Sequence, residues 1–300
     1  MKKIFYYIFL LNLIPYIFVN TFKSTTDLET DDQNIATIRL YKTAEDKIVE
    51  MELEDYIKGV VFCEMPASFN IEALKAQSVA ARTYTYRKIG QNIHENSDIC
   101  DNPAHCQGFR NGDDSEDFKK ISQAVEQTKS EVITFEGNII NALYHASSGG
   151  KTENVSEVFS GNFVPYLSAV DSPGEELMKD YETRAIFTKK EFVDKLKMIN
   201  NDFIFDNCIK ILGRTEGGSV AKVQIGNSEF LGTQIRKIFN LRSSNFNIKN
   251  DDINIEFIVK GYGHGVGLSQ WGAEAMAREG KDYREILAHY YQGTKIEILR

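Results

Sequence analysis

The sequence predicts an α+β protein in which a mixed or antiparallel sheet with helices forms a discontinuous core, interrupted by an inserted smaller lobe. Two runs of apolar residues with helical spacing, at 53–64 and 71–88, predict helices of the core. Short segments that alternate apolar and polar residues between turn signals predict the strands. We expect the core to comprise 35–185 and 251–300, the lobe to span 186–250, and a cleft to separate them.

The composition is that of an ordinary soluble globular protein. The chain has 300 residues, 42% hydrophobic and 26% charged, which is enough for one large domain or two modest ones. Its formal net charge is −8 and no basic stripe stands out, which argues against nucleic acid as a partner. An acidic protein has no general attraction for anionic polymers either, so binding to them must come from a local site.

Residues 1–22 differ in character from the rest of the chain. Lys2 and Lys3 precede an almost entirely apolar run at 4–22, and no small-residue cleavage site follows it. We expect an uncleaved, single-pass anchor in the cell membrane with the lysines on the cytoplasmic side, and a cleaved secretory signal is the alternative. In both cases the C-terminal domain lies outside the cytoplasm, joined to this segment by a polar tether at 23–34.

The core begins with a hairpin and a helix that ends at an acid. Weak alternation over 35–51 predicts two strands around a polar turn. The apolar face of the next helix carries Glu64 in its last turn, and Pro66 stops the helix. Burial and the negative end of the helix dipole both disfavour the ionised carboxylate. A carboxyl kept neutral near pH 7 is what a general acid requires, so Glu64 is the catalytic candidate, with an ordinary exposed glutamate as the alternative.

A second helix follows the proline corner. Asn70 is placed to cap a helix over 71–88, whose alanines allow another backbone to approach closely. Lys75 and Arg82 share one face of this helix. We expect them to form a cationic ridge beside the acid, suited to a polyhydroxyl or partly anionic substrate.

Four residues with metal-binding side chains lie in one short segment. His94, Cys100, His105 and Cys106 can close a tetrahedral zinc site, although the spacing is not a standard zinc-finger pattern. Four protein ligands leave no open position, so Zn²⁺ would be structural and would stiffen the loop near the acid. The alternatives are a Cys100–Cys106 disulfide or two free thiols, and His145 could replace one imidazole.

The middle of the core is predicted as a helix, two strands and a polar loop. The helix is expected at 118–128, and strands at 131–135 and 139–145 flank a Gly-Asn turn. The second strand runs into His145–Thr152, a loop of hydroxyl groups and glycines. Neighbouring side chains on a strand point apart, so this loop is not expected to hold a Ser–His catalytic pair.

The inserted lobe is predicted to contain helices at 187–199 and 232–239 and strands at 208–213 and 219–225. Phe192, Leu196 and Ile199 should form the apolar face of the first helix. Cys208 in the lobe and Cys63 in the core lie in apolar stretches and are expected to be buried thiols.

A strand at 253–260 leads into the glycine loop GYGHGVG. The dinucleotide fingerprint G-x-G-x-x-G is not met in register, and too little chain follows for the rest of such a fold. Glycines at every second position strip one face of side chains, so a sugar ring or another strand can lie against the backbone. His264, Gln270 and Trp271 are candidates to line a saccharide groove. The remaining expected features are helix caps at Ser269 and at Asp282 with Glu285, and a final strand at 295–299.

Four of these stretches together resemble the stage II sporulation protein D family, which also includes amidase-enhancer proteins of the cell wall. They are CEMP at 63–66, EALKAQSVAARTYTYRK at 72–88, SSGGKT at 147–152 and GYGHGVGLSQWGA at 261–273. Their order and number make the resemblance much more specific than any one of them alone, and it covers the chain from about Ile35 to the C-terminus.

The resemblance implies a peptidoglycan lytic transglycosylase that cleaves the MurNAc-β-1,4-GlcNAc bond and leaves a 1,6-anhydro end. It further implies glycan strands stripped of stem peptides as substrate and a role in engulfment during spore formation. The implied partners are an amidase of the stage II sporulation protein P type and membrane engulfment proteins. Hydrolytic glycosidases usually need two carboxylates, whereas this lyase needs one, so Glu64 would be the sole general acid/base. The expected substrate contacts are Lys75, Arg82, Tyr84, His145, Ser147, Ser148, Gly149, His264 and Gln270.

Two other functions stay open. The first is a non-catalytic cell-wall-binding module that enhances an amidase, and the second is a zinc-dependent hydrolase that uses the His/Cys cluster. A second acid beside Glu64 is not evident, because the nearby acids look solvated and those beyond the serine loop are weaker rivals. These are Glu52, Glu54 and Asp55, and then Glu153 and Glu157.

Overall fold

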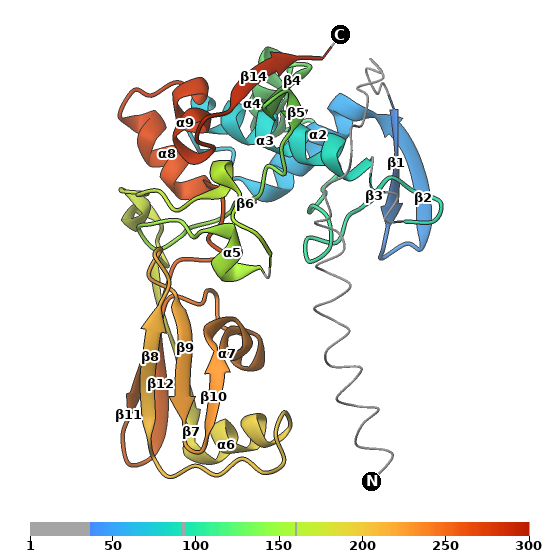
Figure 1. Ribbon diagram of the computed structural model, residues 1–300. Coiled ribbons are helices and arrows are strands. Elements are labelled where there is room, and N and C mark those ends of the chain that lie inside the picture. The colour runs from blue at the N-terminus through green and yellow to red at the C-terminus, as the bar shows by residue number, and fades with distance from the viewer. Residues whose placement is uncertain (1–36, 90, 92–93, 160, 300) are drawn as a thin grey trace.

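The computed structural model describes residues 37–89, 91, 94–159 and 161–299 (Figure 1). The expected membrane anchor at 1–22 and the tether at 23–34 lie outside these residues. Within them, no helix combines the length and the apolar character that crossing a membrane requires. The α+β class is confirmed, but the strands of the core form several small sheets and not one.

Five helices form most of the larger hydrophobic core, in the upper part of Figure 1. The central one, α3, contacts the other four and strand β4. Nearly all of its residues from Ala73 to Thr85 are buried, because its alanines let neighbouring helices pack closely on several sides. The helices are α2 (Leu53–Glu64), α3 (Ile71–Ile89), α4 (Glu116–Gln127), α8 (Gln270–Arg278) and α9 (Tyr283–Tyr290).

The expected helix caps are present. The Asn70 side chain accepts a hydrogen bond from the Glu72 N–H at 3.0 Å, and Ser269 accepts one from the Gly272 N–H at 3.2 Å. Asp282 and Glu285 form a reciprocal capping box at the start of α9. These local signals fix where three helices of the core begin.

The strands of the core pair in three small groups. The expected hairpin is confirmed as β1 (Thr37–Lys42) and β2 (Lys47–Glu52), with β3 (Ile99–Cys100) parallel to β1. β4 (Glu131–Phe135) lies between β5 (Asn138–Ile139) and β14 (Lys295–Ile298). β6 (Tyr144–His145) pairs with β13 (Leu268–Ser269).

The prediction of a single strand at 139–145 is wrong. After Ile139 the chain leaves β4, and Tyr144 and His145 pair in parallel with the end of the glycine loop. The chain then passes through three short helical segments that connect the core with the lobe. They are α5 (Val155–Val158), η1 (Pro165–Leu167) and η2 (Glu175–Leu177).

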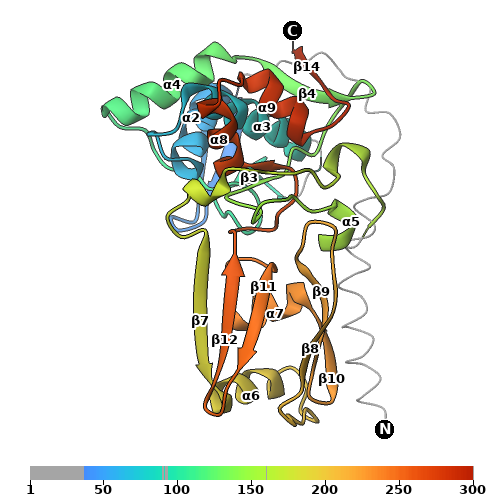
Figure 2. The same cartoon turned by 90° about the vertical axis from the view of Figure 1, so that its left-hand side faces the viewer.

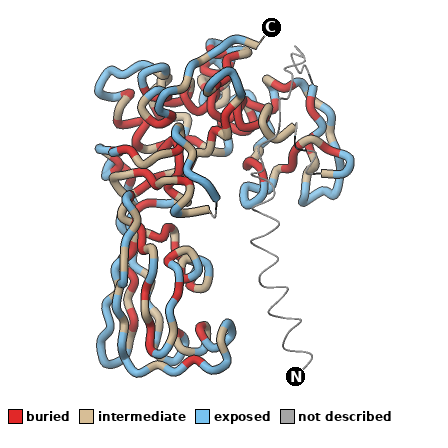
Figure 3. The backbone as a smooth tube through the Cα atoms, viewed as in Figure 1, coloured by how far each residue is buried: buried red, intermediate tan, exposed pale blue. Residues whose placement is uncertain are grey.

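The lobe has its own hydrophobic core, centred on Phe192, Phe239 and Phe257. Two three-stranded antiparallel sheets and two helices surround it, and Figure 2 shows β7, β12 and β11 side by side. Figure 3 shows buried residues running through both the core and the lobe. The elements of the lobe are β7 (Glu182–Thr188), α6 (Lys189–Lys197), β8 (Ile209–Arg214), β9 (Val220–Ile225), β10 (Ser228–Leu231), α7 (Gly232–Phe239), β11 (Phe246–Asn250) and β12 (Asn254–Lys260).

The packing of the lobe extends beyond the expected limits of 186–250. Strand β12 pairs with β7 along its whole length, from Lys260 with Glu182 to Asn254 with Thr188, and contributes to the core of the lobe. The first helix is also shorter than expected. It ends at Lys197, so Ile199 lies outside it with 65% of its surface exposed and does not join the apolar face.

Candidate active site

A cleft of about 1220 Å³ lies where the core meets the lobe. The ends of α2 and α3 and the segment of His105 to Gln107 contribute its walls on the core side. The lobe contributes Arg236 from α7, and the glycine loop contributes Tyr262 to His264. Glu64 and Glu136 are the carboxylates that line this cleft in the described part of the chain, and Glu136 is exposed.

Glu64 is the last residue of α2, as the proline at 66 predicts. Its Oε1 accepts a hydrogen bond from the Gly108 N–H at 3.1 Å, and the side chain is half-buried in the cleft. Burial raises the pKa of Glu64 above its usual value, although the Gly108 N–H and the nearby Gln270 amide partly oppose the shift. The Gln270 amide nitrogen has no hydrogen-bond partner within the described residues, so the Gly108 contact is the closer one. The carboxyl is placed and tuned as a proton donor requires.

The expected cationic ridge on α3 does not face the cleft. Arg82 is fully buried between helices, pairs with Glu54 at 2.6 Å and donates to the Val125 carbonyl. Lys75 pairs with Glu72 at 2.7 Å. The helical repeat correctly predicts one shared face, but that face points into the helical core, so neither residue is available to a substrate in this cleft.

The other acids considered from the sequence also lie away from the cleft lining. Glu54 forms an ion pair with Arg82, so the expectation that it is solvated is wrong. Glu153 is buried and accepts a hydrogen bond from the Ser219 N–H at 3.1 Å. Glu157 is exposed, and Asn154 donates to its carboxylate. Glu64 therefore has no buried carboxylate opposite it in the described cleft.

The expected metal ligands lie together. The donor atoms of His94, Cys100, His105 and Cys106 all lie within 4.8 Å of one another. The His94 Nε2 is 3.4 Å from the Cys106 Sγ, and the His105 Nδ1 lies 3.3 Å from the same sulfur and 3.5 Å from the Cys100 Sγ. Donors around a tetrahedral zinc ion are separated by about 3.3–3.8 Å, given Zn–S and Zn–N bonds of about 2.3 and 2.0 Å. The three close separations match this range, and the widest, up to 4.8 Å, would have to shorten by about 1 Å for all four side chains to bind one ion.

The backbone explains how adjacent residues can both be ligands. The N–H groups of His105 and Cys106 both donate to the Asn102 carbonyl, at 3.0 and 2.8 Å, which makes a tight turn. The same segment continues through the buried Gln107 to Gly108, the hydrogen-bond donor to Glu64. The cluster and the acid are thus connected through a short, well-packed stretch of chain.

The cysteines differ in part from expectation. Cys100 and Cys106 are free thiols, so the structure does not contain the alternative disulfide. Cys63 and Cys208 are exposed and not buried, which contradicts the expectation for both. Cys63 lies on the side of α2 that borders the cleft, next to the acid, where the helix is no longer covered by the core.

The glycine loop packs against the segment that follows β6. A side chain at Gly261 would lie 2.6 Å from the Ser147 carbonyl, and one at Gly263 would lie 2.7 Å from the His145 Cβ. Both glycines have positive φ, at 75° and 119°. The bare face of the loop therefore accommodates another stretch of backbone, which is one of the two alternatives that the sequence left open.

This packing brings two histidines together in the cleft wall. The rings of His145 and His264 are 5.5 Å apart. Burial lowers the pKa of His145 to about 4 and that of His264 to about 3. The His145 Nδ1 donates to the Val266 carbonyl at 3.1 Å, which leaves its buried Nε2 without a partner in the described structure. Both imidazoles are neutral near pH 7, so neither supplies a proton there, while Gln270 and Tyr84 also line the cleft.

Ser147, Ser148 and Gly149 do not contribute polar groups to the cleft lining. They surround Glu175, a buried carboxylate from η2 that sequence reasoning missed. Its oxygens accept from the Ser147 and Ser148 hydroxyls at 3.0 and 2.8 Å and from the Gly149 and Gly150 N–H groups at 2.7 and 2.9 Å. The Ser148 N–H and the hydroxyls of Ser172 and Ser269 complete the set.

Burial alone would raise the pKa of Glu175, but these hydrogen bonds hold it below its usual value. The serine loop, residues 147–150, is therefore built around a buried anion. It supports the wall of the cleft that contains His145 and His264. The SSGG stretch signals a tight loop, but no local pattern in the sequence identifies its partner.

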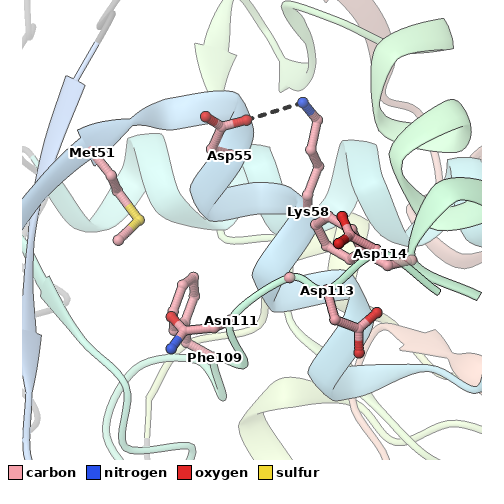
Figure 4. Close-up of a pocket in the computed structure, with 9 residues that line it drawn as sticks. Met51, Asp55, Lys58, Phe109, Asn111, Asp113 and Asp114 are labelled. Carbon is pink, nitrogen blue, oxygen red and sulfur yellow. Dashed lines mark hydrogen bonds and ion pairs between the residues drawn. The ribbon is translucent and has the colours of Figure 1, made fainter.

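A second, shallower pocket of about 460 Å³ lies beside the first turns of α2 (Figure 4). Met51 and Phe109 form its apolar wall. Lys58 is held by Asp55 at 3.0 Å and by Glu126 at 2.8 Å, so its charge is already neutralised. This pocket does not include Glu64 or the metal-ligand cluster.

Comparison with known proteins agrees with the sequence motifs. The profile of a family described as stage II sporulation protein matches residues 41–135. The chain is 35% identical to the stage II sporulation protein D of Bacillus subtilis, over 93% of this chain and 84% of that protein. It is 34% identical to the protein of the same name from Bacillus amyloliquefaciens, over 92% and 83% of the two chains. A Bacillus subtilis protein named amidase enhancer is 30% identical over 80% of this chain and 40% of its own length. The chain belongs to the stage II sporulation protein D family.

Proposed function

We propose that this protein is a peptidoglycan lytic transglycosylase that acts during sporulation, with Glu64 as its sole general acid/base. The observation that supports this most strongly is one half-buried carboxyl with a raised pKa in a large cleft, with no buried carboxylate opposite it among the described residues. Hydrolytic glycosidases place a second carboxylate across the bond, about 5–10 Å away, to act as nucleophile or to activate water. A lyase of this kind needs neither function.

In this mechanism the Glu64 proton moves to the oxygen between MurNAc and GlcNAc while the bond from C1 of MurNAc to that oxygen breaks. The 6-hydroxyl oxygen of the same MurNAc then bonds to C1, and its proton passes to the Glu64 carboxylate. The carboxyl is regenerated, no water is consumed, and the products are a 1,6-anhydro end and a free GlcNAc 4-hydroxyl. The Gly108 N–H contact can persist in both protonation states, because it uses a carboxyl oxygen as acceptor.

We also propose that the His/Cys cluster holds a structural zinc ion. The four side chains supply two imidazoles and two thiolates, a ligand set that favours Zn²⁺ and leaves no open coordination position. Burial raises the pKa of the Cys106 thiol to about 12, so a bound cation is what would stabilise the thiolate there. Bound in this way, the ion would fix the turn at Asn102 and, through Gln107, the position of Gly108 beside Glu64.

The cellular setting follows from the same proposal. We infer an N-terminal anchor in the cell membrane, with the described domain on the extracytoplasmic side, where peptidoglycan glycan strands are available. The relative named amidase enhancer supports a link to an amidase, which would remove stem peptides before the glycan is cut. An amidase of the stage II sporulation protein P type and the membrane engulfment proteins are the proposed partners.

The test is mass spectrometry of products from glycan strands without stem peptides, treated with wild type, Glu64→Gln or Glu136→Gln. Glu136 is the matched control, because it lines the same cleft but is exposed. Wild type and Glu136→Gln should release anhydro-disaccharides, whereas Glu64→Gln should be slower by roughly 10²- to 10⁴-fold, the usual contribution of a general acid. Full activity of Glu64→Gln would remove Glu64 from this role.

Two alternatives give different results in the same experiment. A non-catalytic amidase enhancer, favoured by the third relative, would bind glycan but release no anhydro product at all. A zinc hydrolase would release reducing ends with water incorporated. Chelation separates the roles of the ion, because loss of fold together with activity indicates a structural ion and loss of activity in a folded protein indicates a catalytic one.

A further inference from the structure

Arg236 presents to the cleft a guanidinium group that has no carboxylate partner within the described residues. It lies on α7 of the lobe, and its Nε donates to the Leu241 carbonyl at 3.3 Å. Its two terminal nitrogens have no hydrogen bond or ion pair within the residues that the structure describes. This differs from the buried Arg82, whose terminal nitrogens bind a carboxylate and two carbonyls. A half-buried arginine with four free N–H donors is a site prepared for an external acceptor.

The charges around the cleft favour an anion at this position. The side chains that line it include three cations, Arg87, Lys88 and Arg236, although the whole chain has a formal net charge of −8. The lining carboxyls are Glu64, which must be neutral to act, and the exposed Glu136. Burial removes the charge of Arg236 from water and so lowers the pKa of its guanidinium group. No carboxylate within the described residues offsets the cost of burying this charge.

The histidines near Arg236 do not neutralise it. The pKa values of His145 and His264 are lowered first by burial and, in part, by the positive charge of Arg236 itself. Beside them, the residue Tyr262 is 48% exposed, and the guanidinium carbon of Arg242 lies 4.4 Å from the centre of its ring. The wall of the cleft near the lobe thus offers an aromatic face next to a cation, both accessible to a ligand.

The chemistry of cleavage indicates what this cation does. Glycoside cleavage passes through an oxocarbenium-like, positively charged transition state, which a nearby guanidinium cannot stabilise. The charge of Arg236 is therefore suited to the ground state of an anionic substrate. In a glycan strand without stem peptides the ionised group of each MurNAc is the carboxylate of its 3-O-lactyl ether, and in a strand with peptides that carboxylate is an amide. A planar carboxylate matches the paired N–H groups of a guanidinium.

We propose that Arg236 binds the free lactyl carboxylate of a MurNAc residue and so selects glycan from which the stem peptide has been removed. This inference rests on the proposed function. It assigns the chemical step and substrate selectivity to different parts of the molecule. Glu64, the acid, is on the core, and Arg236, which would bind the substrate carboxylate, is on the lobe. It also gives the acidic chain the local binding site for an anionic polymer that its overall charge requires.

The test compares two substrates with the full-length protein. One is glycan without stem peptides, and the other is the same glycan after carbodiimide coupling to ammonia, which converts each lactyl carboxylate to a neutral amide. The variants are Arg236→Gln and Arg236→Lys, with Lys237→Gln as the matched control for charge, since Lys237 is an exposed neighbour on the same helix. The measured quantities are KM and kcat for release of anhydro products.

Wild type and Lys237→Gln should show a KM roughly 10- to 100-fold lower for the carboxylate glycan, the range expected for a charge-assisted bidentate contact. Arg236→Gln should lose this preference through a higher KM on the carboxylate glycan alone, with kcat little changed. Arg236→Lys keeps the charge without the planar fork and should keep part of the preference. An Arg236→Gln protein that still prefers the carboxylate glycan as strongly as wild type overturns the inference.

Two further measurements keep the test decisive. If Arg236→Gln does not fold, as judged by its unfolding curve in urea, the Arg236→Lys protein decides, and an undiminished preference in it refutes the bidentate contact. If wild type forms no anhydro product, the proposed function fails, but binding of Glu64→Gln and of Glu64→Gln/Arg236→Gln to the two glycans still tests the inference. If both proteins prefer the carboxylate glycan over the amide glycan to the same extent, the inference is refuted independently of catalysis.

Discussion

Replacing Glu175 by glutamine tests whether the serine loop is organised by a buried anion. The carboxylate accepts three backbone N–H bonds and four hydroxyl bonds within the described structure, and no cation forms an ion pair with it there. Glutamine has almost the same shape but replaces one acceptor oxygen by an NH₂ donor. The change therefore alters hydrogen bonding and charge with little effect on packing.

The expected size of the effect follows from the contacts. With its nitrogen at the Oε1 position, the amide leaves the Ser148 N–H without an acceptor, whereas the opposite orientation leaves both Gly149 and Gly150 unsatisfied. The hydroxyl groups can rotate to accept, so at least one buried N–H loses its partner, at about 1–3 kcal/mol. The two remaining backbone bonds lose the contribution of the charge, about 1 kcal/mol each. The sum is a loss of roughly 3–5 kcal/mol in the free energy of unfolding.

Urea unfolding at pH 7 measures this loss, with Glu176→Gln as control because Glu176 is the exposed neighbour. The pH dependence has a defined sign, since the pKa of Glu175 is lowered in the folded protein. Its stabilisation is complete above the ordinary pKa of glutamate, about 4.3, and is lost as the pH falls through the lower folded value. The gap between wild type and Glu175→Gln should therefore shrink on acidification. A Glu175→Gln protein as stable as Glu176→Gln at pH 7 would refute the reasoning.

Three further outcomes are expected. Glu64→Gln should melt at a higher temperature than wild type at pH 8 but not at pH 4. Burial raises the pKa of Glu64, so the wild-type protein loses stability as the pH rises above the usual pKa of glutamate and through the raised pKa of the folded state, whereas glutamine stays neutral. Thermal unfolding at both pH values checks this. Iodoacetamide at pH 8.5 should alkylate the exposed Cys63 and Cys208, as peptide mapping would show, and block glycan cleavage in wild type but not in Cys63→Ser. Glu54→Ala should lower the free energy of unfolding by about 3–5 kcal/mol, since it leaves the fully buried Arg82 charge unpaired, and a loss below about 1 kcal/mol in urea would contradict this.

Sequence reasoning predicted features whose determinants are close together in the chain. The end of α2 at Glu64 depends on a proline two residues later, and the metal-ligand cluster depends on residues within one short loop. Helix caps are equally local, which explains why those at Ser269 and Asp282 were predicted correctly. In these cases the local pattern fixes both the element and the position of the candidate residues.

Features that depend on distant partners could not be predicted in the same way. A helical repeat shows that Lys75 and Arg82 share a face, but not that this face meets Glu54 and the other helices. The role of Glu175 depends on serines and glycines well before and after it in the chain. Arg236 stands in a lobe whose contact with the cleft is set by the packing of two hydrophobic cores. The positions of all these residues depend on long-range contacts that no periodicity encodes.

The way the chain enters and leaves the lobe has a consequence for how the molecule is divided. Strands β7 and β12 run side by side, and just beyond their paired ends the Gly261 N–H donates to the Tyr181 carbonyl at 2.9 Å. The two junctions are thus adjacent, so a core joined directly from Tyr181 to Gly261 would need almost no new linker. Such a trimmed molecule would lose Arg236 but keep Glu64, His145 and His264, so the adjacent junctions allow the lobe to be removed or exchanged at a single point in the chain.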